Sequence, residues 1–210
     1  MQASFRILAP AKLNLFLHVT GKRADGYHLL QSLVAFADIG DALDISPADD
    51  FTLDIKGPFA ADLHESPQEN LVWRAAQSLA QEANVKMCAR ITLHKNLPVA
   101  SGLGGGSSDA AATLLGLTQL WGLTASMETL ENIASRLGAD VAACLYRRPL
   151  CMEGIGEKIT PVENFPGFPA VLANPGVPTP TAAVFNPFGH AFRASAALPQ
   201  GTTAPSWISA

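Results

Sequence analysis

Charged side chains are scarce in this sequence: they make up 15% of its 210 residues, and the formal net charge is only −4. Proteins that bind the nucleic-acid backbone usually carry a basic patch, so this balance argues against a nucleic-acid partner. No apolar run reaches the roughly 18–20 residues that a membrane span needs. Residues 1–14 also lack the basic and apolar segments of a secretory signal. We therefore expect a cytoplasmic protein without a nucleic-acid or membrane partner.

Cysteine is equally sparse, with three residues, Cys88, Cys144 and Cys151. An odd number without a Cys-x-x-Cys pair excludes a disulfide framework and gives no zinc-finger spacing. The five histidines are scattered along the chain. We expect reduced, buried thiols and no structural metal site.

Acidic residues are absent from residues 164–210, although residues 1–163 contain all 18 of them. The same final stretch holds eight of the fifteen prolines, and Arg193 is its one basic residue. Residues 186–210 show neither a helical nor a strand period. We expect an irregular or disordered tail there.

Strand and helix periods both occur before that tail, which favours an α+β fold. In residues 13–19 apolar and other side chains alternate, which predicts a half-buried strand with its leucines on one face. Lys12 and Asn14 then share the opposite face. Further strands are expected at 29–36, 42–48, 51–57, 88–98 and 167–176, and helices at 68–83, 107–121 and 126–137.

The most informative stretch is a glycine loop in which four of residues 102–106 are glycine, followed by Ser107, Ser108 and a helix. Such a loop lets backbone N–H groups point at one place, and the helix N-terminus adds unpaired donors and partial positive charge. Phosphate oxygens suit this arrangement. A plain loop with a serine N-cap is the simpler alternative. Either serine could cap the helix, bind phosphate or reach a phosphate-bound Mg²⁺.

Lys12 and Asp140 could supply the remaining chemistry of phosphoryl transfer to an alcohol. That reaction needs a positioned phosphate, a group that offsets its charge and an acceptor for the hydroxyl proton. Each residue has a simpler interpretation: Lys12 could lie on a solvated strand face, and Asp140 could be the N-cap of a helix after Gly138. Tyr27 and His28 could be ordinary loop residues.

Four stretches together carry a family resemblance: PVASGLGGGSSDAAA at 98–112, PAKLNLFLHVTGKRADGYHLL at 10–30, LGADV at 137–141 and NPGVPTPTAAVF at 174–185. The first resembles the loop of the GHMP kinases, which act on galactose, homoserine, mevalonate and phosphomevalonate. Within that family, the other three are similar to the branch that acts on a cytidine diphosphate methylerythritol in non-mevalonate isoprenoid synthesis. The resemblance covers about residues 5–185. It implies a nucleotide domain over 1–150, like domain 2 of ribosomal protein S5, and the start of a ferredoxin-like substrate domain over 151–185.

The resemblance also implies ATP-dependent phosphorylation of the 2-hydroxyl of that substrate, with Mg²⁺ carried by the ATP. Asp140 would take the hydroxyl proton, and Lys12 beside it would offset negative charge in the transition state. The implied ATP-binding residues are Pro98, Val99, Ala100, Ser101, Gly102, Leu103, Gly104, Gly105, Gly106, Ser107 and Ser108, with Asn70 and Lys95 near the adenosine. The implied substrate-binding residues are Asn14, Tyr27, His28, Thr181 and Phe185, whose ring would stack on cytosine.

One departure from the family is the lack of a third glycine-rich motif of the type GSGAC. We expect the C-terminal domain to be largely missing and turnover to be impaired, because catalysis depends on alignment at the scale of an ångström. Two alternatives stay open: a non-catalytic nucleotide-binding remnant, or a kinase for another alcohol such as homoserine or mevalonate. The stretch GKRADGYH argues against the second. We expect a monomer or a weak homodimer.

Overall fold

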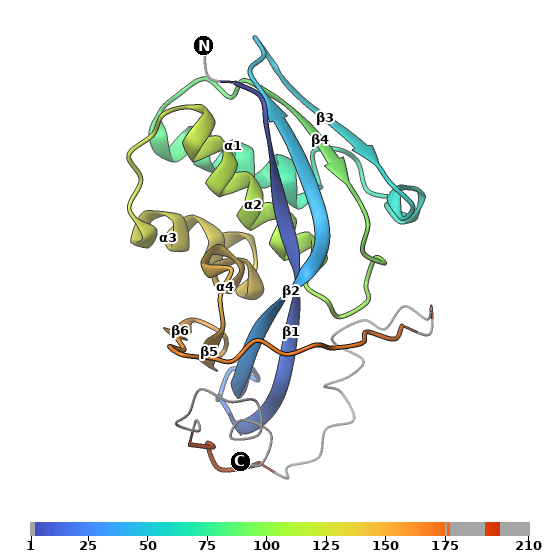
Figure 1. Cartoon of the computed structure of the whole chain (residues 1–210). Helices are drawn as coiled ribbons and strands as arrows, with labels where there is room; N and C mark the ends of the chain where they lie inside the picture. Colours follow the sequence, from blue (N-terminus) through green and yellow to red (C-terminus); the bar gives the residue numbers. More distant parts are fainter. Residues whose placement is uncertain (1–2, 175, 177–191, 198–210) are drawn as a thin grey trace.

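A computed structural model describes residues 3–174, 176 and 192–197, and a six-stranded sheet is its main feature (Figure 1). The strands are β1 (Phe5–Lys22), β2 (His28–Ser46), β3 (Phe51–Lys56), β4 (Ala89–His94), β5 (Leu150–Gly154) and β6 (Lys158–Pro161). β1 pairs along one edge of β2, while β4 and β5 pair with opposite ends of its other edge. β3 runs parallel to β4, and β6 pairs antiparallel with β5. The long strand β2 therefore joins the two ends of the molecule.

The β1–β2 ribbon contains three register shifts, between Pro10 and Lys12, between Asn14 and Phe16, and between Val19 and Gly21. The first shift adds two residues to β2, and each of the other two adds one residue to β1, which disturbs the simple alternation of faces along the ribbon. As a result Leu15 and Leu17 are 39% and 42% exposed. The predicted buried face of leucines is therefore wrong, because simple alternation holds only for an unbroken ladder.

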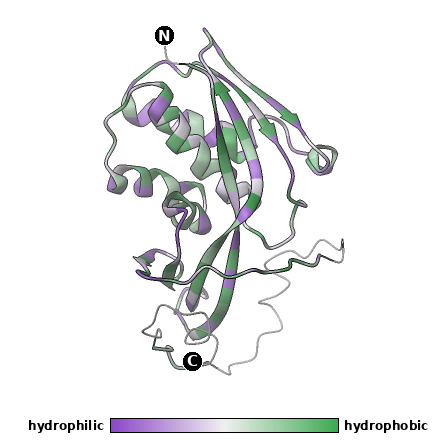
Figure 2. Cartoon of the chain, viewed as in Figure 1, coloured by the Kyte–Doolittle hydropathy of each residue, from purple (hydrophilic) through white to green (hydrophobic). Residues whose placement is uncertain are grey.

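Four helices cover one face of the sheet (Figure 1): α1 (Leu71–Ala83), α2 (Gly105–Leu120), α3 (Met127–Leu137) and α4 (Ala139–Tyr146). A short 3-10 helix, η1, spans Ala60–Asp62. The predicted helices at 68–83 and 126–137 are confirmed as α1 and α3. Figure 2 shows hydrophilic and hydrophobic residues interspersed along α3, and the buried residues of both helices are all apolar, as one-sided burial requires. Their first turns are capped by the side chains of Asn70 and Ser126.

The central helix α2 packs against α1, α4, β1 and β2, and most of its residues from Ser108 to Leu120 are buried. Alanine and glycine suit this position because neighbours approach it from several sides. A Cβ on Gly116 would collide with the side chain of the core residue Ile45. α2 begins at Gly105, two residues before its predicted start, because the glycine loop itself provides the N-cap, Gly104.

Several other expectations need correction. The predicted strands at 29–36 and 42–48 are one strand, β2, and α4, β5 and β6 were not predicted. Residues 167–174 contain no strand, although a strand was expected over 167–176. The sheet continues past residue 150 through β5 and β6, so the start of a second domain stays a prediction. Within the described ranges, no helix is long and apolar enough to cross a membrane.

Candidate active site

The glycine loop covers Lys12 on β1. The backbone N–H of Lys12 donates to the carbonyl oxygen of Leu103 at 2.8 Å, which ties the strand to the loop. A Cβ placed on Gly104 would lie 3.0 Å from the Cβ of Lys12, and Gly104 has a φ of 64°. Both this conformation and the close approach therefore favour glycine. Lys12 is only 4% exposed, which excludes the solvated strand face as an interpretation.

The Lys12 ammonium group lies between two oxygen acceptors. Its Nζ donates to Asn14 Oδ1 at 2.8 Å and lies 3.4 Å from Asp140 Oδ1. The first contact confirms that Lys12 and Asn14 share a face of β1. The side chain of Asp140 is 43% exposed, so its carboxylate contacts the ammonium and still faces solvent. Lys12 and Asp140 thus have the proximity that the resemblance implies.

Asp140 lies in the first turn of α4, and the N-cap of that helix is Gly138 without a side-chain cap. The N-cap interpretation of Asp140 is therefore wrong. One turn later, Cys144 is buried, and this burial raises the pKa of its thiol to about 12. The thiol stays protonated near neutral pH and is a packing group. Cys144 and Cys151 are buried free thiols, as expected, and Cys88 is a half-buried one.

The loop turns into α2 through residues with positive φ: Ala100 at 55°, Gly102 at 77° and Gly104 at 64°. The first N–H groups of a helix have no intrahelical acceptor, so this end presents donors next to Lys12. Ser108 Oγ donates to the carbonyl oxygen of Pro10 at 2.8 Å and is buried. The serine N-cap interpretation is wrong, because both Ser107 and Ser108 lie inside the helix.

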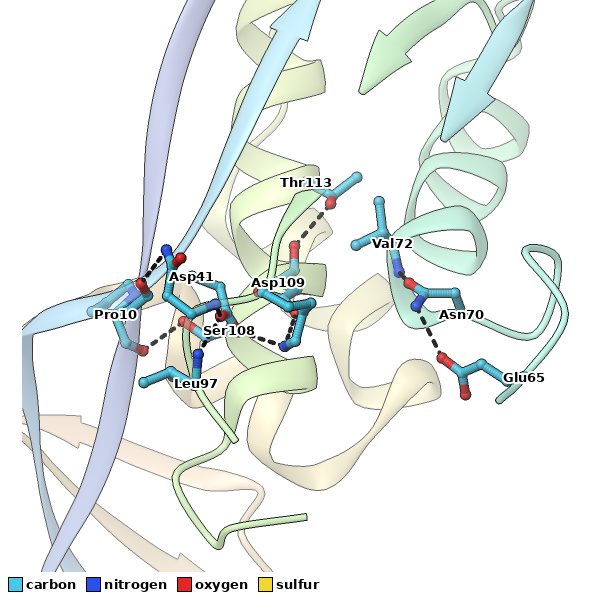
Figure 3. A network of polar contacts seen from close by, with 12 residues as sticks. Pro10, Asp41, Glu65, Asn70, Val72, Leu97, Ser108, Asp109 and Thr113 are labelled. Carbon is cyan, nitrogen blue, oxygen red and sulfur yellow. Dashed lines mark hydrogen bonds and ion pairs between the residues drawn. The ribbon is translucent and has the colours of Figure 1, made fainter. Parts of the chain in front are cut away.

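A buried charged triad lies beneath the loop (Figure 3). Lys95 Nζ donates to Asp41 Oδ2 at 2.5 Å and to Asp109 Oδ2 at 2.8 Å. The other oxygen of Asp41 accepts the backbone N–H groups of Asn96 and Leu97. These contacts join β2, the segment after β4 and the second turn of α2. The triad therefore holds the base of the glycine loop in place.

Burial and the neighbouring charges oppose each other in this triad, with different outcomes for Asp109 and Lys95. It raises the pKa of Asp109 to about 7, despite the opposing effect of Lys95, and Asp109 Oδ1 has no partner. Burial alone would lower the pKa of Lys95, but the carboxylates of Asp109 and Asp41 outweigh it and raise that pKa. Removing one member would leave the others as poorly compensated buried charges.

Two predicted ATP-binding residues make contacts within the protein, and two predicted substrate-binding residues lie at a distant turn. Asn70 caps α1, with Oδ1 accepting from the Val72 N–H at 2.9 Å, and Lys95 is bound to two carboxylates. Tyr27 and His28 lie at the turn between β1 and β2, and Tyr27 is 62% exposed. The register places this turn well along the ribbon from Lys12. Their ligand roles stay predictions, as do those of Thr181 and Phe185, which lie outside the described residues.

Sequence reasoning missed three residues of this region, Asp41, Asp109 and Ser32. Asp41 follows an apolar segment of β2, and Asp109 follows two serines at the start of an apolar helix. A carboxylate in an apolar run is a usable signal of a buried pair. Ser32, which hydrogen-bonds to Asn14, gives no such signal because serine is common on any strand face.

Comparison with known proteins identifies the family. Residues 70–148 match the family model for the GHMP kinases N terminal domain. The chain is 52% identical over 209 residues to the 4-diphosphocytidyl-2-C-methyl-D-erythritol kinase of Parvibaculum lavamentivorans, covering 96% of this chain and 72% of that protein. The chain belongs to the 4-diphosphocytidyl-2-C-methyl-D-erythritol kinase family. The kinase of the same name from Paramagnetospirillum magneticum is 52% identical over 182 residues, covering 87% of this chain and 63% of that one.

Solved structures agree with this membership. A crystal structure of 4-(cytidine 5'-diphospho)-2C-methyl-D-erythritol kinase matches with a TM-score of 0.64 and 39% identity, covering 75% of this chain and 55% of that chain. Mevalonate kinase from Methanococcus jannaschii matches with a TM-score of 0.56 at 14% identity, which supports the fold alone. The expected α+β fold of the GHMP kinases is confirmed. The chain spans between 55% and 72% of the lengths of these family members.

Proposed function

We propose that this protein transfers the γ-phosphoryl group of ATP to the 2-hydroxyl of 4-diphosphocytidyl-2-C-methyl-D-erythritol. The observation that carries the proposal is the Lys12–Asp140 pair, 3.4 Å apart, next to a glycine loop that opens into the N-terminus of α2. The three functions of a phosphoryl-transfer site then meet in one place: phosphate binding, charge compensation and proton acceptance. The names of the relatives support the choice of substrate.

In the proposed mechanism the loop and the first turn of α2 hold the phosphates of ATP by backbone N–H groups. The substrate hydroxyl oxygen bonds to the γ-phosphorus, and the bond to the departing ADP oxygen breaks. Asp140 Oδ accepts the hydroxyl proton, as the open side of its carboxylate allows. Lys12 offsets the negative charge that gathers on the transferred group. Asn14 holds the lysine ammonium in place.

Magnesium fits this site as a companion of ATP. In the part of the chain that the structure describes, no group of three or more His, Cys, Asp or Glu residues is arranged to hold a metal. Mg²⁺ commonly binds to substrate phosphates through few protein ligands, and there it would neutralise phosphate charge. Of the two loop serines, Ser108 already donates to Pro10, which leaves Ser107 as the better candidate to reach the ion.

The substrate assignment adds Tyr27, His28, Thr181 and Phe185 as proposed contacts of the cytidine end. Aromatic rings such as those of Tyr27 and Phe185 suit stacking on a base. We also propose that the protein is located in the cytoplasm and that it is a monomer or a weak homodimer. A nucleotide-binding protein without turnover is the alternative class, and another alcohol substrate is the alternative within the family.

A coupled assay of ADP release tests the proposal. The 210-residue chain would be given Mg²⁺-ATP with the cytidyl methylerythritol, homoserine or mevalonate, and calorimetry would measure ATP binding in parallel. We expect ADP release that depends on the cytidyl compound, with the phosphate found on its 2-hydroxyl, at a rate below that of an ordinary kinase because turnover is expected to be impaired. ATP binding without ADP release would favour the non-catalytic alternative, and release with homoserine or mevalonate would favour the other substrates.

A further inference from the structure

A continuous chain of hydrogen bonds extends from the Lys12 ammonium into the sheet. Lys12 Nζ donates to Asn14 Oδ1 at 2.8 Å, and Asn14 Nδ2 donates to Ser32 Oγ at 2.7 Å. Ser32 Oγ then donates to the carbonyl oxygen of Phe16 at 2.7 Å. Lys12 is 4% exposed and Ser32 is 2% exposed, so the chain is anchored at both ends in the interior.

The direction of this chain is determined by Ser32. A serine hydroxyl has one proton, and here Phe16 accepts it, so the oxygen offers only a lone pair to Asn14. The Asn14 amide must then turn its NH₂ group toward Ser32 and its oxygen toward Lys12. The opposite orientation would place the amide NH₂ against the ammonium, donor against donor, and Oδ1 against a serine oxygen whose proton is already donated to Phe16, acceptor against acceptor.

The pairing of β1 and β2 brings the Ser32 hydroxyl within hydrogen-bonding distance of Asn14 and of the Phe16 carbonyl. The pairing register of β1 and β2 shifts between Asn14 and Phe16, and Ser32 lies opposite Leu17. At this irregularity the Phe16 carbonyl accepts a side-chain hydroxyl from β2. A buried hydroxyl on β2 can therefore reach across to a side chain and a carbonyl of β1.

We infer that Ser32 is a positioning residue for phosphoryl transfer, acting through the Asn14 amide to hold the Lys12 ammonium beside Asp140. The inference rests on the proposed function for its effect on rate. Ser32 would contact neither ATP nor the alcohol. Its role is to remove the rotational freedom of Asn14, because a displaced cation would no longer face the charge that develops during transfer.

The kinetic test is a double-mutant cycle in the full chain. We expect Ser32→Ala to lower kcat about tenfold with the KM for ATP within about twofold, because one hydrogen bond is lost and no substrate contact is removed. Ser32→Thr, which keeps the hydroxyl, should restore most of the rate. In an Asn14→Ala background, Ser32→Ala should have no further effect. Multiplying effects, or failure of the threonine variant with an intact fold, would overturn the inference.

A second readout does not depend on turnover. Side-chain ¹⁵N relaxation reports the order parameter of the Asn14 NH₂ group, whose signal is identified by its loss in Asn14→Ala. Ser32→Ala should lower that order parameter below about 0.6, while the exposed control Ser135→Ala leaves it and kcat unchanged. An immobile Asn14 amide in Ser32→Ala would overturn the inference. Absence of turnover in the unaltered chain, with the amide still immobilised by Ser32, would count against the proposed function alone.

Discussion

At the scale of single residues, Lys12 and Asp140 differ in their access to water. The lysine is buried and held by Asn14, whereas the carboxylate is 43% exposed. A fixed cation and an accessible base are the arrangement that an alcohol substrate needs, because the substrate must reach the base while the cation stays in place. The two roles are therefore divided: Lys12 would supply a fixed positive charge, and Asp140 would accept the proton.

Asp140→Asn tests that division. The amide cannot accept the hydroxyl proton, so kcat should fall by about 10²–10⁴, while the Kd for ATP stays within about twofold. Rapid-quench kinetics and calorimetry measure the two quantities. Lys12→Met should also lower kcat strongly. Equal loss of turnover and ATP affinity in Asp140→Asn would show that the residue supports the structure of the nucleotide site.

Asp109 gives a prediction on stability and pH. Its pKa is about 7 in the fold against an ordinary value of 3.8, so between these values the folded protein binds more protons than the unfolded chain. The contribution of Asp109 to stability is therefore fully present below about pH 4 and is lost as the pH rises to about 7. Asp109→Asn removes this loss. The free energy of unfolding of the variant, compared with that of the unaltered chain, should therefore increase as the pH rises from about 4 to about 7. Urea unfolding at several pH values measures it, and parallel pH curves would contradict it.

At the scale of elements, β1 and β2 approach each other closely at Gly40, next to the site. A Cβ on Gly40 of β2 would lie 2.7 Å from the Cα of Pro10 and closer still to the carbonyl of Ala9. These are backbone atoms, so they cannot move aside without separating the strands. Gly40 precedes Asp41 of the charged triad, and Pro10 accepts from Ser108 of α2. The glycine lets β1, β2 and α2 meet.

Gly40→Ala should therefore destabilise the protein by about 2–3 kcal/mol, as overpacking against rigid neighbours does. Thermal and urea unfolding would measure the change. Gly167→Ala is the matched control, because nothing lies within 4 Å of its added Cβ, and it should change stability by less than about 0.5 kcal/mol. Equal stability of the two variants would mean that the strands can separate at Gly40 at little cost.

At the scale of the whole molecule, residues near the C-terminus lie beside the β1–β2 ribbon. The N–H of Arg193 donates to the carbonyl of Val19 at 2.9 Å. The Gln31 amide bonds twice to the backbone of Ala196, accepting from its N–H at 2.6 Å and donating to its carbonyl at 3.0 Å. The Gln31 side chain thus both donates to and accepts from the backbone of one residue, as a neighbouring strand would, and it attaches residues 192–197 to β2.

Trypsin can test this attachment, because Arg193 is the one basic residue after residue 163. Gln31→Ala removes two hydrogen bonds, so the release of residues 194–210 should accelerate about tenfold in timed mass spectrometry. Gln77→Ala, on the exposed side of α1, should leave the rate unchanged. Equal cleavage rates in both variants would show that Gln31 does not restrain the segment.

The sequence pattern correctly predicted the helices whose ends and buried face depend only on residues close together in the chain. α1 and α3 have capping side chains, Asn70 and Ser126, and one apolar face, so their positions were readable. The exposure of Leu15 and Leu17 was not, because register shifts in β1 depend on its pairing with β2. The short strands β5 and β6 also depend on pairing partners, since β5 pairs with β2 and β6 pairs with β5.

The sequence by itself determined the glycine loop, the order of the motifs and the family, because these depend on residue types at fixed spacing. The tertiary structure alone decided which charges lie together. Lys12 is bound to Asn14 and faces Asp140, while Lys95 is enclosed by Asp41 and Asp109. Two lysines that look alike in sequence thus differ because burial makes a charged group depend on the partners that distant strands and helices bring to it.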